Sequence, residues 1–416
     1  MSETRAATET TFFVQDVPES ISRTEGASLS GLSICHFTTA HSQLKSRSFH
    51  RICLPFARRG ASVTYISPAQ VTHPGPICLV PIPQRSSRVS RALWNRPLLR
   101  ELCAAEAQVY HFQDPELLPL ALALKLFLKK RVIYDAYEDF PSMARNSRSI
   151  PRPFRRLSAQ MVALAERLAA RFLDAIVTAD PFTLRRLARC GTSPKLVVSN
   201  FPNLEFFPPP ASGPKAFDLV YRGGLSRRAG THDLLDAMQS LKSRSRSLRL
   251  LLIGYFDASS DENDLRDGIQ RRGLTASVEI RGRIPHEQMA SALGEAKIGI
   301  CPLHATSKFE LNVPVKVFEY WACGLPVIAT DLTPIRPYLR TANAGLLFEP
   351  GDVAGLARSI EWLADHPRTA DAMGRNGRAA VISRFNNRLE IRRFEKLLAQ
   401  VTTRGKQRDP RKGNDA

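Results

Sequence analysis

One carboxylate within an apolar helix is the residue of this sequence best suited to ligand chemistry. The run 314–331, PVKVFEYWACGLPVIATD, predicts a helix that Pro314 opens and Gly324 closes, followed by a strand at 327–329. Glu319 lies in the second turn of this helix. A carboxylate near a helix start can hold a diol while the free backbone N–H groups there hold a phosphate. The segment therefore predicts a site for a nucleotide sugar.

A glycine-rich turn follows the strand expected at 217–222. Gly223 and Gly224 would let the backbone approach a ligand, and the helix expected at 231–241 would offer its first N–H groups to a phosphate. Three arginines are close enough in sequence to balance phosphate charge: Arg222, Arg227 and Arg228. A tight strand-to-helix turn without a ligand explains the same pattern, and the sequence leaves both interpretations open.

The helix and the turn together resemble the donor-binding half of retaining glycosyltransferases of family 4, which have the GT-B fold of two doubly wound Rossmann-like domains. In that family the glutamate of an F-E-Y-M-A-x-G-x-P-V-I run grips the donor ribose, and Glu319 is the matching residue. The family's turn usually runs G-R-L-x-x-x-K-G, with its Arg and Lys on the donor diphosphate. Gly224 and Ala229 occupy these two positions here.

The segment before the helix holds the candidate contacts to the donor sugar. Many family members carry a glutamate there, at a spacing that falls on Leu311 in this chain, whereas Glu310 is one place earlier. The chain instead resembles a branch with a P-x-K-x-F-E-Y signature. The candidates for donor binding are Lys308, Asn312 and Lys316, with Glu310 as a catalytic candidate. Lys316 fits a solvated first-turn residue equally well.

Blocks in the first half of the chain resemble the acceptor side of the same family. VYHFQDPELLPLA has Gln113 in place of a family histidine, and its Asp114 is an acceptor-side candidate or a helix N-cap. In RVIYDAYEDFP the family histidine that faces the sugar–acceptor junction is Tyr137, a catalytic candidate that can donate a hydrogen bond but is no base at neutral pH. His41 and Arg47, in the block after the first strand, are further acceptor-side candidates.

Composition narrows the class of protein. A chain of 416 residues with 43% hydrophobic residues is long enough for two globular domains with separate cores. Seven scattered cysteines without a CxxC pair predict reduced core residues, with no zinc site and no disulfide framework. Neither a leader nor a run of the ~18 apolar residues that a spanning helix needs is evident, so a cytoplasmic protein is expected.

The positive charge is unevenly placed. The formal net charge is +20, and the stretch between Glu25 and Glu101 has ten basic residues and no acidic one. Arg145 to Arg156 adds five arginines. Such a field favours an anionic partner: a membrane leaflet at the inner membrane face, a diphosphate-linked acceptor or nucleic acid. Plain solubility is the alternative.

Two arginine-rich segments have apolar residues at helical spacing. One is 85–102, with Val89, Leu93 and Trp94, and the other is 150–172, with Phe154, Leu157, Met161 and Leu164. A basic amphipathic helix with aromatic anchors can lie in a membrane interface. A helix that packs on its own sheet gives the same pattern, and both interpretations remain open.

Alternating apolar runs and helical stretches predict parallel sheets covered by helices. Strands are expected at 32–38, 62–67, 109–113, 131–134, 175–178 and 195–199, then at 217–222, 250–254, 278–281 and 298–302, with a helix at 46–59. The predicted organisation is a disordered segment 1–30, an acceptor-side domain 31–200, a proline-rich linker 201–215, a nucleotide-sugar-binding domain 216–385, a helix 386–402 that crosses back to the first domain, and a disordered tail 403–416.

The resemblance implies a metal-independent transfer of a sugar, with retention, from a nucleotide-diphosphate sugar to a saccharide or polyprenyl-diphosphate-linked acceptor in surface polysaccharide biosynthesis. It implies no cofactor besides this co-substrate. The departures at Gln113, Tyr137, Gly224 and Ala229 motivate an alternative, a GT-B-fold binding or scaffold protein without turnover. Another GT-B activity, such as an epimerase or phosphorylase, fits the F-E-Y branch less well, and a nucleic-acid-binding protein would fit only the charge.

Overall fold

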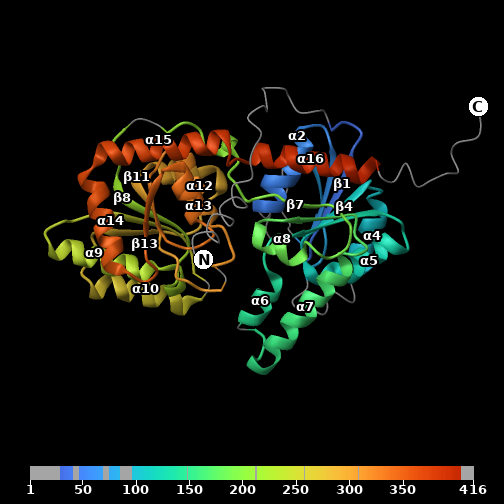
Figure 1. Cartoon of the computed structure of the whole chain (residues 1–416), viewed down its shortest axis with the longest axis horizontal. Coiled ribbons are helices and arrows are strands. Elements are labelled where there is room, and N and C mark those ends of the chain that lie inside the picture. Colours follow the sequence, from blue (N-terminus) through green and yellow to red (C-terminus); the bar gives the residue numbers. More distant parts are fainter. Residues whose placement is uncertain are drawn as a thin grey trace, which may run out of the picture. The chain divides into compact units, whose positions relative to one another are not determined.

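The computed structural model divides the chain into two units (Figure 1). It describes residues 29–40, 46–68, 75–84, 96–147, 149–210, 213–256, 258–307 and 309–403. The N-terminal unit comprises the described part of 29–200 together with 387–403, and the C-terminal unit comprises the described part of 201–386. Each unit is built on one parallel sheet.

Seven parallel strands form the sheet of the N-terminal unit, in the order β3-β2-β1-β4-β5-β6-β7. Their bounds are β1 (Ser33–Phe37), β2 (Ser62–Ser67), β3 (Ile77–Pro81), β4 (Val109–Phe112), β5 (Arg131–Ala136), β6 (Ala175–Thr178) and β7 (Lys195–Val197). The order reverses between β1 and β4. Ligands of doubly wound sheets bind beside such a reversal, at the carboxyl ends of the strands.

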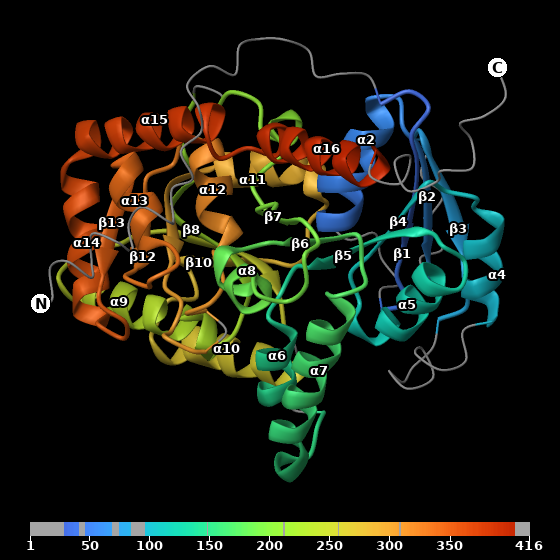
Figure 2. The same cartoon turned by 45° about the vertical axis from the view of Figure 1, so that its right-hand side comes forward.

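Helices cover both faces of this sheet (Figure 2). One face buries Phe56, Phe394 and Leu397, and the other buries Leu98, Leu118 and Leu124. The helical elements are η1 (Ser46–Cys53), α2 (Leu54–Arg58), α4 (Arg96–Ala104), α5 (Leu118–Leu126), α6 (Phe140–Asn146), α7 (Arg155–Ala169), α8 (Pro181–Leu187) and α16 (Asn387–Thr403).

The sheet of the C-terminal unit repeats this topology with six strands, in the order β10-β9-β8-β11-β12-β13. The strands are β8 (Phe217–Gly224), β9 (Leu250–Tyr255), β10 (Val278–Arg281), β11 (Ala296–Cys301), β12 (Val327–Thr330) and β13 (Gly345–Phe348). The helices are α9 (Thr231–Ser243), α10 (Ser259–Arg271), α11 (Met289–Gly294), α12 (Val315–Ala322), α13 (Arg336–Ala342), α14 (Val353–Asp365) and α15 (Pro367–Ser383). Its reversal lies between β8 and β11, so the carboxyl end of β8 is where a ligand is expected.

The last helix, α16, packs on the N-terminal unit. The Asn387 side chain donates to the Arg51 carbonyl at 2.8 Å. The ring of Phe394 meets that of Phe56 edge-on, with centroids 5.3 Å apart. The chain therefore returns to its first unit at Asn387, close to the start of the range expected for the crossing helix, 386–402.

The proline-rich segment 201–215 is not a free linker, which corrects the prediction. Its Phe201 and Phe207 are buried in the core of the C-terminal unit. The Phe201 ring meets that of Phe318 edge-on, with centroids 4.7 Å apart. The apolar side chains between the prolines anchor the segment, so this unit begins at Phe201 rather than at 216.

Other expectations are corrected or lie outside the described residues. Strands β3 and β13, each at a sheet edge, are not predicted from the sequence. The helix expected at 46–59 is a π-helical segment, η1, continued by α2. Cys78 and Cys103 are exposed rather than in the core. The segments expected to be disordered, and the apolar run of 85–95, fall outside the described residues apart from positions 29, 30 and 403. None of the described helices has the length and apolar character to cross a membrane.

Candidate functional site

Helix α12 carries the buried carboxylate of the C-terminal unit. It starts directly after Pro314 and is followed by Gly324, whose φ of +72° is the left-handed conformation that glycine adopts readily. Its Phe318, Tyr320 and Trp321 are buried. Glu319 lies between them with 0% exposure. A buried charge needs a partner, so its surroundings decide what it does.

The partner of Glu319 comes from the carboxyl end of β8. Arg222 Nη1 lies 3.0 Å from Glu319 Oε2, and 28% of the arginine side chain is exposed. The backbone fixes this pairing, because Arg222 N donates to the Tyr320 hydroxyl at 2.8 Å. Tyr320 in turn donates to the Ile300 carbonyl at 3.2 Å. The pair therefore joins α12 to β8 at the switch point and has one partly exposed member.

Lys316 lies beside the same pair, one turn before Glu319. Its ammonium donates to the Tyr221 hydroxyl at 3.0 Å and lies 4.1 Å from the centre of that ring. Tyr221 donates to the Gly224 carbonyl at 2.8 Å. Lys316 is therefore held over the glycine turn, which corrects its interpretation as a solvated first-turn residue.

Two glycines of the turn are required by its geometry. Gly223 has a φ of +140°, and a Cβ there would lie 3.0 Å from Lys316 Nζ. Gly230 has a φ of +74°, and a Cβ there would lie 1.7 Å from the Pro302 carbonyl oxygen. The turn thus packs against the end of β11 just before α9 begins. His304 strengthens this contact, because its Nε2 lies 2.9 Å from Asp233 Oδ2 in α9.

Arg227 is directed to a neighbouring helix. Its guanidinium makes two hydrogen bonds to Asp264 of α10, at 2.8 and 2.6 Å. His232 Nε2 also lies 3.0 Å from that carboxylate. The bond to Arg227 lowers the pKa of Asp264, and burial lowers the pKa of His232. The predicted phosphate contact is thus engaged in an exposed ion pair, which contributes roughly 0–1 kcal/mol and can be exchanged.

The remaining donor-side candidates lie in the loop before α12. Glu310 is exposed, and its backbone N–H donates to the Thr306 carbonyl at 2.9 Å. Asn312 is partly buried, and Lys308 lies outside the described residues. Arg228 is exposed on the glycine turn. The structure thus brings together Glu319, Lys316, Gly223 and Gly224 around Arg222. No local sequence signal indicates that Arg222 lies next to Glu319.

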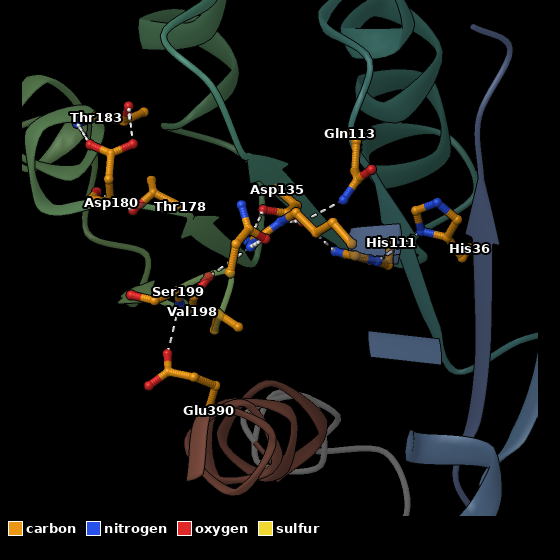
Figure 3. Close-up of polar contacts among 12 residues, drawn as sticks. His36, His111, Gln113, Asp135, Thr178, Asp180, Thr183, Val198, Ser199 and Glu390 are labelled. Atoms are coloured by element: carbon orange, nitrogen blue, oxygen red, sulfur yellow. Dashed lines mark hydrogen bonds and ion pairs between the residues drawn. The ribbon is translucent and has the colours of Figure 1, made fainter. Parts of the chain in front are cut away.

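A second buried carboxylate lies in the N-terminal unit, at the end of β5 (Figure 3). Asp135 is 0% exposed and receives two hydrogen bonds from Arg47, at 2.9 and 2.7 Å. Gln113 donates to the same carboxylate at 2.7 Å. Arg47 also donates to the Val198 carbonyl and to Asn200, at 2.7 and 2.8 Å. Arg47 is only 6% exposed, so this acceptor-side candidate is committed to a buried network.

Two histidines continue this network (Figure 3). His36 Nδ1 and His111 Nδ1 are 2.9 Å apart, and His111 Nε2 lies 3.7 Å from Asp135 Oδ2. Burial lowers the pKa of His111 to about 4, against the attraction of Asp135. His111 is therefore neutral at neutral pH, and one ring of the pair donates the hydrogen bond while the other accepts.

Asp114 stands at the N-cap position of a short helical turn (Pro115–Leu117), but its side chain does not cap it. Its Oδ2 accepts from the Thr38 hydroxyl at 2.6 Å and from Thr39 N at 2.9 Å. Asp114 therefore fixes the loop after β1, at the carboxyl ends of the strands. The N-cap interpretation is wrong because partners distant in sequence take the carboxylate.

Tyr137 follows β5 and is partly buried. Its ring meets that of Phe140 edge-on, with centroids 5.3 Å apart, and its N–H donates to the Asp135 carbonyl at 2.9 Å. Burial raises the pKa of Tyr137, so its hydroxyl remains protonated at neutral pH. A protonated hydroxyl can donate a hydrogen bond but cannot act as a base. His41, the other candidate of this side, lies outside the described residues.

The C-terminal unit has a recognisable family match. Residues 204–380, which lie in this unit, match the family described as glycosyl transferases group 1. The chain is 25% identical over 178 residues to the amylovoran biosynthesis glycosyltransferase AmsK of Erwinia amylovora, covering 42% of this chain and 43% of that protein. It is 25% identical over 235 residues to the D-rhamnosyltransferase WbpZ of Pseudomonas aeruginosa, covering 53% and 58%. These matches span less than two thirds of the relatives' own length.

Solved structures of this fold superpose on nearly the whole chain. Sucrose-phosphate synthase from Thermosynechococcus elongatus has a TM-score of 0.72 at 18% identity, covering 90% of this chain and 100% of that one. Anabaena HepE in complex with UDP-glucose has a TM-score of 0.69 at 15% identity, covering 89% and 100%. The chain therefore has the GT-B fold, as predicted. Among the described residues, no group of three or more His, Cys, Asp or Glu side chains could hold a metal ion.

Proposed function

We propose that this protein transfers a sugar from a nucleotide-diphosphate sugar to a saccharide or lipid-linked acceptor during surface polysaccharide assembly. The observation that carries the proposal is the buried Glu319 carboxylate, paired with a partly exposed arginine at the switch point of β8. A domain match to glycosyl transferases group 1 and relatives described as polysaccharide biosynthesis glycosyltransferases support it. They do not favour a binding protein without turnover.

In this proposal Glu319 accepts hydrogen bonds from the ribose diol of the donor. Carboxylate oxygens are acceptors only, which suits two neighbouring hydroxyl groups. Arg222 at 3.0 Å and Lys316, held over the glycine turn, supply positive charge toward the diphosphate. Gly223 and Gly224 let the backbone N–H groups approach it. Arg227 and Arg228, with Asn312 and Lys308, remain further donor-side proposals.

The transfer step needs stabilisation of the leaving diphosphate more than it needs a protein nucleophile. Positive side chains and backbone N–H groups that are already in place lower the energy of the developing charge. We propose that the leaving diphosphate takes the proton of the acceptor hydroxyl as the glycosidic bond to the acceptor forms, with retention and without a metal. Tyr137 donates a hydrogen bond near the acceptor in this scheme, and Glu310 contacts the sugar.

A thermal-shift panel with UDP, GDP, ADP and TDP tests the nucleotide site. A nucleotide at 100 times its Kd stabilises the folded protein by about 2.7 kcal/mol. UDP is the first choice, because HepE structures contain UDP and UDP-glucose. Glu319→Gln should lose most of the shift, and the exposed Glu349→Gln should keep it. No shift with any nucleotide would contradict the proposal.

A turnover assay distinguishes an enzyme from a binding protein without turnover. Sugars on the nucleotide that binds are offered with saccharide and polyprenyl-diphosphate-linked acceptors, and the anomeric configuration of the product is read by NMR. We expect transfer with the configuration of the donor. Tight nucleotide binding with no transfer to any acceptor class would instead support the scaffold interpretation.

A further inference from the structure

The large apolar side chains of α7 face away from the N-terminal unit. Helices α6 and α7 form a pair that projects from the sheet of this unit in both views (Figures 1 and 2). Five apolar residues along α7 and its start are exposed by 43% to 63%: Phe154, Leu157, Met161, Leu164 and Leu168. Their spacing of three and four residues puts them on one side of the helix, and we call them the α7 stripe.

The opposite face of α7 has mostly small residues, and Val162, which is partly buried, is the large apolar residue among them. Ala159 and Ala163 are partly buried, and Ala169 is fully buried. Glu166 is also buried there, accepting from the Tyr134 hydroxyl at 2.8 Å and pairing with Arg186. A helix of a soluble protein normally turns its large apolar residues to the core. Here the order is inverted, which is typical of a helix whose outer face meets an apolar medium.

A second exposed apolar segment lies next to the end of α7. Leu126 ends α5 and is followed by Phe127 and Leu128; all three are exposed, Phe127 by 81%. The ion pair between Lys125 and Asp174, at 2.5 Å, ties the end of α5 to the turn that follows α7. Phe172, in that turn, is 50% exposed. The apolar surface therefore extends beyond one helix.

The charges around the stripe are positive. Arg156 and Arg167 are exposed and share one flank of the stripe, three helical turns apart. The only acidic residue of α7 is the buried Glu166. Lys129, directly after the second apolar segment, is exposed as well. A second copy of this chain would bring like charges together, whereas an anionic lipid surface complements both the arginines and the apolar residues.

We propose that the α7 stripe inserts into the interface of an anionic membrane, with Arg156 and Arg167 on lipid headgroups. This inference rests on the proposed function, because membrane binding would bring the protein to a lipid-linked acceptor, which is confined to the membrane. Within the exposed apolar surface of the N-terminal unit, it assigns the membrane insertion to the α7 stripe.

Flotation of the full chain with lipid vesicles tests the proposal. Wild type should bind vesicles of phosphatidylcholine with 30% phosphatidylglycerol and should bind pure phosphatidylcholine much less. Leu157→Gln/Met161→Gln should weaken binding by about 30-fold. The matched control is Trp362→Gln/Ile382→Gln, two exposed apolar residues of the C-terminal unit, which should bind as wild type does.

A second pair of variants tests the electrostatic contribution to vesicle binding. Arg156→Gln/Arg167→Gln should weaken binding to the anionic vesicles by about 20-fold. Arg368→Gln/Arg375→Gln removes the same charge from exposed positions of α15 and should have little effect. Equal losses in the two variants would show that net charge and not the α7 surface governs binding.

Three results would overturn the proposal. The first is the absence of vesicle binding by wild type, and the second is vesicle binding that the stripe variant leaves unchanged. The third is a wild-type dimer in sedimentation velocity that the stripe variant turns into a monomer. Nucleotide thermal shifts in vesicle-free buffer, measured on the same variants, report the proposed function separately, and the stripe variants should retain them.

Discussion

Two buried carboxylates, one in each unit, are paired with arginine in different ways. Asp135 accepts hydrogen bonds from Nε and Nη2 of Arg47 and from Gln113, and Arg47 is 6% exposed. Glu319 pairs with Arg222, whose side chain is 28% exposed. Both members of the first pair are buried. In the second pair the arginine is partly exposed, and we propose that a ligand reaches the pair from that side.

A buried carboxylate paired with arginine can thus be structural or can belong to a ligand site. The Arg47–Asp135 pair is out of a ligand's reach because both side chains are buried, so we expect it to stabilise the fold. A pair with an exposed member can exchange protein contacts for ligand contacts. Local sequence does not distinguish the two, since both acidic residues lie in apolar surroundings of their own elements.

The largest expected effect is on stability, at Asp135. Asp135→Ala leaves the buried Arg47 without its carboxylate and should lower the free energy of unfolding by about 3–5 kcal/mol. Urea unfolding followed by circular dichroism measures it. The double variant Arg47→Met/Asp135→Leu should recover much of the loss. A single variant as stable as wild type would show that the pair is not structural.

The second effect distinguishes the arginines of the donor side. Arg222→Gln should lower affinity for the bound nucleotide by about tenfold or more, because it removes a charge-assisted contact. Arg227→Gln should lower affinity less, since Arg227 has to leave Asp264 before it can contact the diphosphate. Isothermal titration with the two variants measures this difference. The reverse order would show that Arg227 leaves Asp264 and becomes the diphosphate contact.

The smallest effect is a pH dependence in the N-terminal unit. Glu390 of α16 accepts from Ser199 N at 2.7 Å, and burial raises its pKa from the ordinary 4.5 to about 7 (Figure 3). The folded state therefore holds the proton of Glu390 more tightly than the unfolded state does. This difference stabilises the fold fully below pH 4.5, and the stabilisation is lost as the pH rises through 7.

Glu390→Gln should consequently be more stable than wild type at pH 8, by about 1–2 kcal/mol, and close to it at pH 5. Melting temperatures at the two pH values give the measurement. The exposed Glu349→Gln is the control and should show no such difference. A gain in stability that is equal at both pH values would show that ionisation of Glu390 is not its cause.

The sequence predicts those features that depend on neighbours in the chain. Helix α12 follows from Pro314, Gly324 and the apolar residues between them, so its bounds differ little from the prediction. The role of Lys316 could not be predicted, because its partner Tyr221 is 95 residues away. For the same reason Asp114 was open to an N-cap interpretation, since Thr38 is 76 residues distant.

Edge strands and the direction of helix faces also could not be predicted from the sequence. Strand β3 lies at the edge of its sheet and pairs on one side only. Its short apolar run, ICLVP, ends in a proline, a residue that marks edge strands and loops alike, so the sequence alone does not identify it as a strand. In α7 the sequence shows an apolar stripe but not its direction. The small residues on the opposite face decide that direction, because they allow close packing on the body of the unit.

The most direct test of the central claim is the affinity of UDP for Glu319→Gln, measured by isothermal titration beside wild type and Glu349→Gln. Loss of a charged acceptor for the ribose should weaken binding by about 50-fold, while the control binds as wild type does. UDP binding by Glu319→Gln with wild-type affinity would contradict the account and place Glu319 with Asp135, among the structural carboxylates.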